Sequence, residues 1–411
     1  MAPSLPPYAR PTLSSQSRRQ IQSNRSSLLD ESTATSEIQT GSSVRLSATT
    51  APSTTSSGRR QSVKNATVRD ADFEDTQLAP RGINIERQQD IGLGASAGAY
   101  AYFASDPPPD LAQSREFYKS KVQHSLAGKV DRDIDDSIFL PVDDDFVQSV
   151  QRAYCSLGEA KLPESEYKAY ACQDLFVGQY VLLAKDTTRQ LCAVRSVEWS
   201  LKPEPKSVVY AWHTPPIVPP DHPPLKPFNF DIEPDCQFWL CDKILNADYR
   251  QNINIVVHSK PLGAFCPYFS IEFKARTDDQ WVVLNQVAAA GSASLYNRYQ
   301  LKLNAYPRPT HKQWELVRHF GLTMERENWK MWLFEPKIEE EASWAGCNIR
   351  NICSGTCTSE QGVRKLLSWI NEVHRWGLCE YAPGCEDDIK HVILSKDPNK
   401  PRMSGVGFSE E

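Results

Sequence analysis

Strict alternation of apolar and polar residues across positions 268–274 constrains the fold of this 411-residue chain more than any other feature. The apolar set is Phe269, Ile271 and Phe273, and the polar set is Ser270, Glu272 and Lys274. Successive side chains of a β-strand point to opposite faces of a sheet, so a period of two is the period of a strand. We therefore expect a strand here, with one apolar face and one polar face.

The segment that follows, residues 280–303, predicts a helix that lies close to this strand. Its side chains at helical spacing are small: Val283, Val287, Ala290, Gly291 and Ser294. Small side chains let a helix approach a sheet closely, and a strand followed by such a helix favours an α/β fold. We expect a small mixed sheet flanked by helices.

Further elements follow from the same kind of pattern. Helices are predicted for residues 144–157, 164–173 and 359–376, a short strand for 236–241, and a hairpin for 320–324 and 329–334. At the helix over 359–376, Thr358 and Gln361 match a capping box, and Gly377 is the expected C-terminal stop.

The N-terminal part of the chain has a different composition. Residues 1–78 are rich in Ser, Thr, Pro and Arg and nearly free of aromatic residues. Such a segment buries too little apolar surface to offset chain entropy, so we expect a disordered tail. Residues 79–139 are predicted to be an irregular lead-in, residues 140–395 the folded domain, and residues 396–411 a flexible C-terminal tail.

Charge is unevenly spread along the chain. Residues 1–69 hold nine basic and three acidic residues, a net charge of +6, whereas the whole chain carries −5, which leaves −11 for the rest. A basic tail fits weak, salt-sensitive contact with nucleic acid. The acidic body argues against strong binding of nucleic acid.

Eleven cysteines are scattered along the chain, an odd number. Residues 1–30 lack the apolar region of a signal peptide, and no apolar run approaches the roughly 18 residues of a membrane span. We therefore expect reduced thiols, an intracellular protein of the nucleus or cytoplasm that is not secreted, and no membrane segment.

Two acids and a lysine are the candidate catalytic and metal-binding residues of this sequence. Glu272 and Lys274 are two residues apart on one predicted strand, so both point to the same face. Asp235 begins another strand 37 residues earlier. If the two strands are neighbours, the carboxylates of Asp235 and Glu272 converge and can hold Mg²⁺, which prefers oxygen ligands. Lys274 can then orient or deprotonate a water, or neutralise charge on a phosphate. The alternative interpretation of Glu-x-Lys is a solvated strand face with an exposed ion pair.

The order of these motifs resembles the PD-(D/E)XK nuclease superfamily. The matching residues are Pro234-Asp235, then Cys266-Pro267-Tyr268-Phe269-Ser270-Ile271-Glu272-Phe273-Lys274, then Gln286-Val287-Ala288-Ala289-Ala290. The combination is similar to a group of fungal nuclease-like domain proteins, with a similar C-terminal helix at Trp369-Ile370-Asn371 and Trp376-Gly377-Leu378. The similarity covers residues 140–385, and residues 227–300 are diagnostic.

The resemblance implies a restriction-endonuclease-like core of order α-β-β-β-α-β. It implies that Asp235 and Glu272 are ligands of Mg²⁺ or Mn²⁺, that Lys274 is the catalytic lysine, and that Gln286 supports the site. Glu164 and Glu166 are the candidates for one more acid on the first core helix. The implied function is a metal-dependent nuclease acting on DNA or RNA. The alternative is a nuclease-like domain that has lost cleavage and serves as a binding or accessory module, within a fungal gene cluster.

A zinc site and a hydrolase triad are competing interpretations. Zinc ligands are available in principle from Cys347, Cys353, Cys357, Cys379, Cys385 and His374. No Cys-x-x-Cys pair occurs among them, and a predicted helix separates the two groups, so free cysteines are favoured. The sequence holds no Gly-x-Ser-x-Gly elbow and no P-loop. A catalytic triad assembled in space stays open.

Overall fold

The computed structural model describes residues 65–89, 133–134, 138–177, 190–201, 212–218, 226–257, 259–260, 263–274, 280–338 and 343–396. These residues belong to one unit, Ser62–Glu411. The predictions for residues 1–64 and 397–411 lie outside the described residues. Among the described helices, none is long and apolar enough to cross a membrane.

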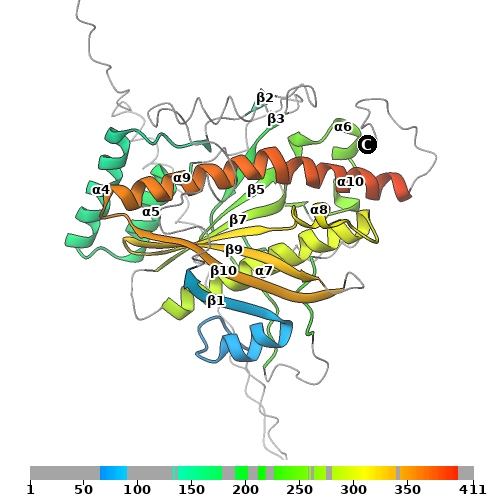
Figure 1. The fold of residues 1–411 in the computed structure, drawn as a ribbon, viewed down its shortest axis with the longest axis horizontal. Helices are drawn as coiled ribbons and strands as arrows, with labels where there is room; N and C mark the ends of the chain where they lie inside the picture. The colour runs from blue at the N-terminus through cyan, green and yellow to red at the C-terminus, as the bar shows by residue number, and fades with distance from the viewer. Residues whose placement is uncertain are drawn as a thin grey trace, which may run out of the picture. The chain divides into compact units, whose positions relative to one another are not determined.

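A mixed sheet forms the centre of this unit (Figure 1). Within the described residues its strand order is β1-β10-β9-β8-β7-β5-β4, and the short strand β6 pairs with β7 beside this path. The bounds are β1 Ile83–Gln89, β4 Ala193–Ser196, β5 Cys236–Cys241, β6 Ser259–Lys260, β7 Ala264–Lys274, β8 His319–Glu325, β9 Asn328–Ile338 and β10 Trp344–Thr356. Strands β1 and β10 are parallel, as are β7 and β8, and the other neighbours are antiparallel. Strands β2 (Asp133–Ile134) and β3 (Gln190–Leu191) pair separately. The α/β class is confirmed.

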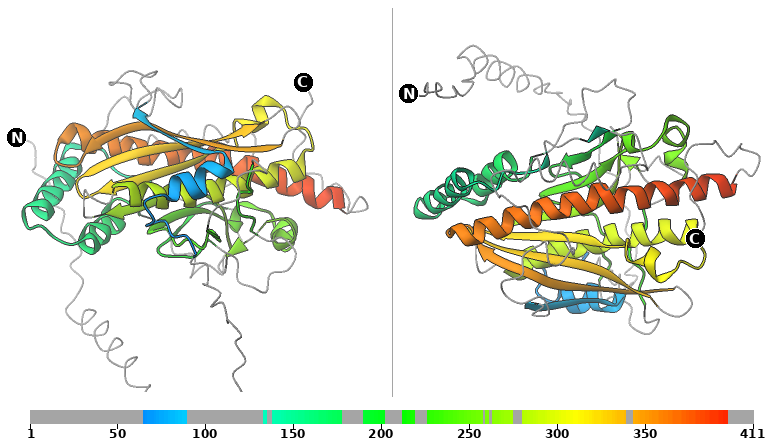
Figure 2. Two further views of the ribbon diagram at one scale, coloured as in Figure 1. Left: turned by 90° about the horizontal axis from the view of Figure 1, so that it is seen from below. Right: turned by 45° about the horizontal axis from the view of Figure 1, so that its top comes forward.

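Helices cover both faces of the sheet. Their bounds are α4 Asp144–Glu159, α5 Glu164–Asp174, α6 Ala247–Arg250, α7 Gln280–Ala305, α8 His311–Trp314, α9 Glu360–Trp376 and α10 Ala382–Lys396. Short helical turns are η1 Glu74–Leu78, η2 Ala79–Arg81, η7 Asp242–Ile244, η8 Ile253–Ile255 and η11 Gly377–Tyr381. Most of the buried side chains of α7 share a core with one face of the sheet, and those of α4, α5, α9 and α10 share a core with the other. Figure 2 shows α7 on one side of the strands and the consecutive helices α9 and α10 on the other.

Strand β7 lies in the interior of the sheet, between β5 and β8. Helix α5 is followed by β4, β5 and β7, which pair as antiparallel neighbours. Helix α7 then crosses over the sheet to β8, which pairs parallel to β7. A parallel pair requires such a crossover, and a helix is its usual form. Strand β7 is therefore hydrogen-bonded on both edges.

The predicted close approach of α7 to the sheet is confirmed. A Cβ atom on Gly291 would lie 2.4 Å from the ring of Phe334 on β9, closer than any real side-chain contact. Ala288, Ala289 and Ala290 beside it are fully buried. Small residues are needed here because the helix and the sheet leave no room for larger ones.

The helix predicted for residues 359–376 is confirmed as α9, with Gly377 as its C-cap, but the predicted capping box of Thr358 and Gln361 is wrong. Its N-cap is Ser359, whose Oγ accepts a hydrogen bond of 3.1 Å from the N–H of Gly362. Gly377 keeps a right-handed helical conformation and leads through η11 into α10. A Cβ on Gly377 would lie 2.6 Å from the ring of Tyr268, so this glycine also permits close packing.

Residues 65–89 fold differently from the predicted tail and lead-in. Phe73, Leu78 and Ile83 are buried in the core on the α7 face. Strand β1 pairs parallel to β10, with Ile83 opposite Cys347. Most of residues 1–78 are polar, so the average composition of this segment does not reveal the few apolar residues that are buried. The partner strand lies more than 250 residues away, so no local pattern indicates this pairing.

Candidate active site

The register between β5 and β7 brings Asp235 next to Glu272. The two strands are antiparallel, with Cys236 opposite Ile271. Continued by one residue, this register sets Asp235 opposite Glu272. The Oδ2 atom of Asp235 accepts a hydrogen bond of 2.9 Å from the backbone N–H of Phe273. The predicted condition for convergence, that the two strands be neighbours, is met.

Lys168, on α5, makes the closest ion pair with Asp235. Its Nζ lies 2.8 Å from Asp235 Oδ1 and 2.5 Å from Glu198 Oε1. Burial lowers the pKa of Lys168, but the hydrogen bonds to Asp235 and Glu198 outweigh it and raise this pKa to about 12. Lys168 is therefore charged. The sequence interpretation missed this residue, although Lys168 lies one helical turn after Glu164 and so on the same side of α5.

The carboxylate of Glu272 is deeply buried. The residue is 1 % exposed, and within the described residues neither Oε1 nor Oε2 has a hydrogen-bond partner. Burial and the nearby charge of Asp235 raise the pKa of Glu272 well above its usual range, against a weaker opposing effect of Lys274. Burial of an unpaired carboxylate is costly, and this cost favours the neutral acid over the ion at Glu272.

Lys274 is also buried and is held by two oxygens. Its Nζ lies 3.1 Å from Glu164 Oε1 and donates a hydrogen bond of 2.7 Å to its neighbour's backbone oxygen, Phe273 O. Glu164 begins α5, so the first of the two predicted helix acids reaches the site. Glu166 is exposed. The structure thus gathers Glu164, Lys168, Asp235, Glu272 and Lys274 at one end of β7.

The alternative interpretation, a solvated strand face, is wrong. All eleven residues of β7 are buried, including the polar Ser270, Glu272 and Lys274. Ser270 Oγ accepts a hydrogen bond of 2.8 Å from Gln237 Nε2 and lies 2.9 Å from His319 Nε2. The polar face of β7 is therefore an internal polar layer of the protein.

Gln286 lies on α7 and is half-buried. Its Oε1 is buried and has no hydrogen-bond partner in the described parts of the chain. Among these residues, no hydrogen bond joins Gln286 to Asp235, Glu272 or Lys274. The structure places Gln286 on the predicted helix without joining it to the acid pair.

The donor set suits a hard divalent cation in part. Mg²⁺ is commonly held by one or two carboxylates and keeps several waters. The two unpartnered oxygens of Glu272 fit such a cation. Asp235 fits only after a rearrangement, because Lys168 and the Phe273 N–H occupy its two oxygens. Within the described residues no group of three or more His, Cys, Asp or Glu side chains is placed to hold a metal.

That finding also removes the zinc interpretation. All eleven cysteines lie in described segments and are free thiols. His374 Nδ1 is engaged with the hydroxyl of Tyr268 at 2.9 Å. The six candidate zinc ligands therefore form no metal-binding cluster.

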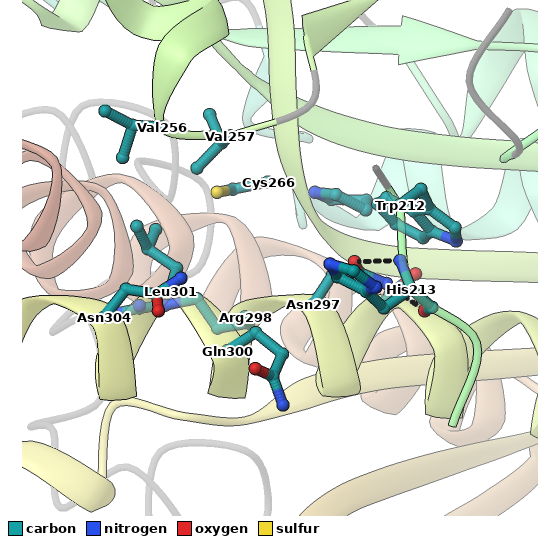
Figure 3. Close-up of a pocket in the computed structure, with 12 residues that line it drawn as sticks. Trp212, His213, Val256, Val257, Cys266, Asn297, Arg298, Gln300, Leu301 and Asn304 are labelled. Carbon is teal, nitrogen blue, oxygen red and sulfur yellow. Dashed lines mark hydrogen bonds between the residues drawn. The ribbon is translucent and has the colours of Figure 1, made fainter. Parts of the chain in front are cut away.

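A pocket of about 60 Å³ lies toward the other end of β7. Cys266, Arg298 and Leu301 are among the side chains that line it (Figure 3). Cys266 precedes Glu272 by six residues, about 20 Å along a strand. Neither Asp235 nor Glu272 lines the pocket. The pocket and the acid pair are therefore separate features.

The chain was compared with protein-family models, curated proteins and solved structures, and none of them matches it.

Proposed function

We propose that this protein is a metal-dependent nuclease of the PD-(D/E)XK type, which hydrolyses phosphodiester bonds in DNA or RNA. One observation carries the proposal: the register of β5 and β7 sets Asp235 beside Glu272, with Lys274 two residues further along the same strand face. Two carboxylates beside a lysine are the groups that metal-assisted phosphodiester hydrolysis requires.

The element order supports the same proposal. Helix α5, strands β4, β5 and β7, helix α7 and strand β8 follow one another as α-β-β-β-α-β. This is the order that the resemblance implies, with the aspartate at the second strand and Glu-x-Lys on the third. Glu164 comes from the first helix of that series and contacts Lys274. Because a fold hosts many functions, the order supports the proposal and does not carry it.

Each residue has a role in this proposal. Asp235 and Glu272 would hold Mg²⁺ or Mn²⁺, and the bound ion would supply polarisation of the phosphodiester and acidification of a water. Lys274, fixed by Glu164, would orient the attacking water or stabilise charge on the phosphate. Gln286 would support the site from α7. Lys168 must leave Asp235 Oδ1 before an ion binds there.

One feature favours a second candidate, a nuclease-like domain that binds a partner without cleaving. Lys168 already forms an ion pair with Asp235, at 2.8 Å. The part of the chain after residue 69 is acidic, with a net charge of −11. In a nuclease-like domain that does not cleave, we expect a lysine ammonium in the place of the metal and a negative net charge.

Cleavage assays separate these candidates. Mixed DNA and RNA substrates are incubated with the full-length protein in Mg²⁺, Mn²⁺ or EDTA. We expect metal-dependent cleavage that Asp235→Asn and Lys274→Ala each reduce by at least about a hundredfold, the usual scale for loss of an acid–base or electrostatic group. Asp242→Asn, a half-buried acid at the other end of β5, is the matched control and should retain activity.

Circular dichroism and thermal unfolding check that each variant is folded. Cleavage that survives both site substitutions would overturn the proposed site. A folded wild-type protein that cleaves neither substrate would favour the binding or accessory function.

A further inference from the structure

The pocket near the start of β7 has both apolar and polar side chains in its lining. The apolar ones include Val256, Val257 and Leu301, and the polar ones include Asn297 and Arg298. Figure 3 shows Val256 and Val257 on one side of the pocket and Leu301 on the other. Its volume of about 60 Å³ has room for about four to six waters, or for an organic molecule with about as many non-hydrogen atoms.

Arg298, on α7, is the residue of this lining that points to a ligand. It is 2 % exposed, and its Nη1 donates a hydrogen bond to Asp388 Oδ2 on α10. Within the described residues, the buried Nε and Nη2 atoms have no hydrogen-bond partner. The guanidinium carbon lies 5.5 Å from the centre of the Tyr381 ring, a contact that attracts the cation without satisfying its N–H groups. Buried donors are costly to leave unpaired, so such groups in native proteins usually meet a water or a bound molecule.

The charges next to the pocket do not balance. Asp388 is fully buried and is paired with both Arg298 and Lys302, the latter at 2.6 Å. Two cations share one carboxylate, so this cluster has one positive charge in excess. Burial, and then the charge of Arg298, lower the pKa of Lys302, against the opposing effect of Asp388. An uncompensated charge in the interior acts more strongly than it would in water, so the cluster favours an anion nearby.

The other acids on this part of α10 do not cancel that charge. Glu386 has its own partner, Lys390, at 2.9 Å. The carboxylate of Asp387 accepts a hydrogen bond of 2.6 Å from the Tyr306 hydroxyl and is 45 % exposed, so solvent screens it. Neither acid lines the pocket.

We propose that this pocket binds a small organic monocarboxylate. Nε and Nη2 lie on the same edge of the guanidinium, and two parallel N–H groups of that kind match the two oxygens of a carboxylate. Because both atoms are buried, the guanidinium of Arg298 turns slightly toward the pocket on binding, while Nη1 stays with Asp388. A short alkyl tail then packs against Val256, Val257 and Leu301.

The lining favours a carboxylate over an inorganic anion. Inorganic phosphate carries up to two negative charges at neutral pH and has no apolar part. The pocket has one positive charge in excess beside it and apolar side chains opposite. A singly charged anion with a short apolar tail satisfies both features.

Isothermal titration calorimetry with sodium propionate tests the proposal. The full-length protein is titrated in a HEPES buffer that contains no metal, no nucleic acid and no other carboxylate. We expect a Kd between about 10 µM and 1 mM, the range open to a ligand of about five non-hydrogen atoms. Propionamide, which has the same size without the charge, and sodium chloride should each bind at least about tenfold more weakly.

Two variants locate the site. Val257→Trp fills the pocket and leaves every charge in place, and Arg298→Met removes the unpartnered N–H groups but leaves Lys302 paired with Asp388. Each should weaken propionate binding at least about tenfold. Ile255→Trp is the matched control, because Ile255 is exposed and does not line the pocket, and it should bind propionate as the wild type does.

Thermal unfolding checks that each variant is folded, and Val257→Trp keeps the test valid if Arg298→Met is not. Equal affinity for propionate and propionamide would overturn the role of Arg298. Unchanged propionate affinity in Val257→Trp, or no binding below about 10 mM, would overturn the site itself. The titration contains neither metal nor nucleic acid, so its outcome is separate from that of the cleavage assay.

Discussion

At the scale of single residues, two histidines at the centre of the protein each have a polar partner. His319 and His374 are both fully buried, and burial lowers the pKa of each to about 3. His374 meets Tyr268 and packs edge-on to Phe238, and His319 meets Ser270. Both imidazoles are neutral in the folded protein, and both must take up a proton on unfolding in mild acid.

These histidines predict loss of stability in acid. Their pKa is depressed in the folded state, so their stabilisation is present above about pH 6.5, the unfolded value, and falls as the pH drops toward 3. Each contributes a slope of up to about 1.4 kcal/mol per pH unit. Urea unfolding between pH 7.5 and 4.5 measures the slope, and His374→Phe should reduce it by up to one proton. An unchanged slope in His374→Phe would contradict the prediction.

The ion pair of Lys168 and Asp235 leads to a second prediction at this scale. Lys168→Met removes the ammonium that occupies Asp235 Oδ1. If a divalent cation binds between Asp235 and Glu272, we expect Mn²⁺ affinity to rise about tenfold or more, or about 1.4 kcal/mol. Isothermal titration calorimetry measures this affinity.

Lys330→Met is the control for that experiment, because Lys330 pairs with the buried Glu325 on β8 instead. It should leave Mn²⁺ affinity unchanged. Equal Mn²⁺ affinity in the wild type and Lys168→Met would show that Lys168 does not compete with the metal.

At the scale of elements, the position of α7 depends on glycine. The Gly291 Cα faces the ring of Phe334, and a Cβ there would lie 2.4 Å from that ring. Gly158, on α4, has its nearest neighbour at 3.8 Å from a built Cβ, which is ordinary contact. The two glycines are both helical, but only the first one is required by packing.

Matched alanine substitutions test this difference. Gly291→Ala should destabilise the protein by about 1–3 kcal/mol through overpacking. Gly158→Ala should stabilise it by up to about 1 kcal/mol, since alanine favours a helix. Chemical unfolding measures both, and Gly291→Ala with Phe334→Leu should recover part of the loss. A neutral Gly291→Ala would mean that α7 shifts freely on the sheet.

At the scale of the whole molecule, residues 65–89 are part of the folded unit. Strand β1 covers the edge of β10, and Phe73, Leu78 and Ile83 are buried with the α7-side core. Burial of each such side chain is worth about 1.5–3 kcal/mol. Gly82 and Gly346 let the two backbones approach where the strand begins, with a built Cβ at 2.2 Å from the facing backbone oxygen in each case.

Two N-terminal deletions test this assignment. A chain that begins at Ser62 should unfold within about 2–4 °C of the full-length protein, the shift that about 1 kcal/mol gives in a domain of this size. A chain that begins at residue 90 should unfold well below it or aggregate, because it exposes the edge of β10. Equal melting temperatures for the two chains would show that β1 adds nothing to stability.

The local elements of this protein are readable from its amino-acid sequence. Alternation across residues 268–274 specified strand β7, and small residues at helical spacing specified α7 and its close packing. The same patterns set Asp235 at the start of one strand and Glu272 on another. These features are readable because strands and helices impose fixed periods on neighbouring residues.

The surroundings of those residues depend on contacts between distant segments of the chain. The polar face of β7 is buried because helices cover both faces of the sheet. The alternation of residues along a strand does not indicate whether a helix packs on it. Lys168 and Glu164 reach the site because α5 packs beside β7, and β1 joins β10 across more than 250 residues. Gly377 has no room for a Cβ because the Tyr268 ring packs against it. Such contacts join distant parts of the chain, where no local period acts.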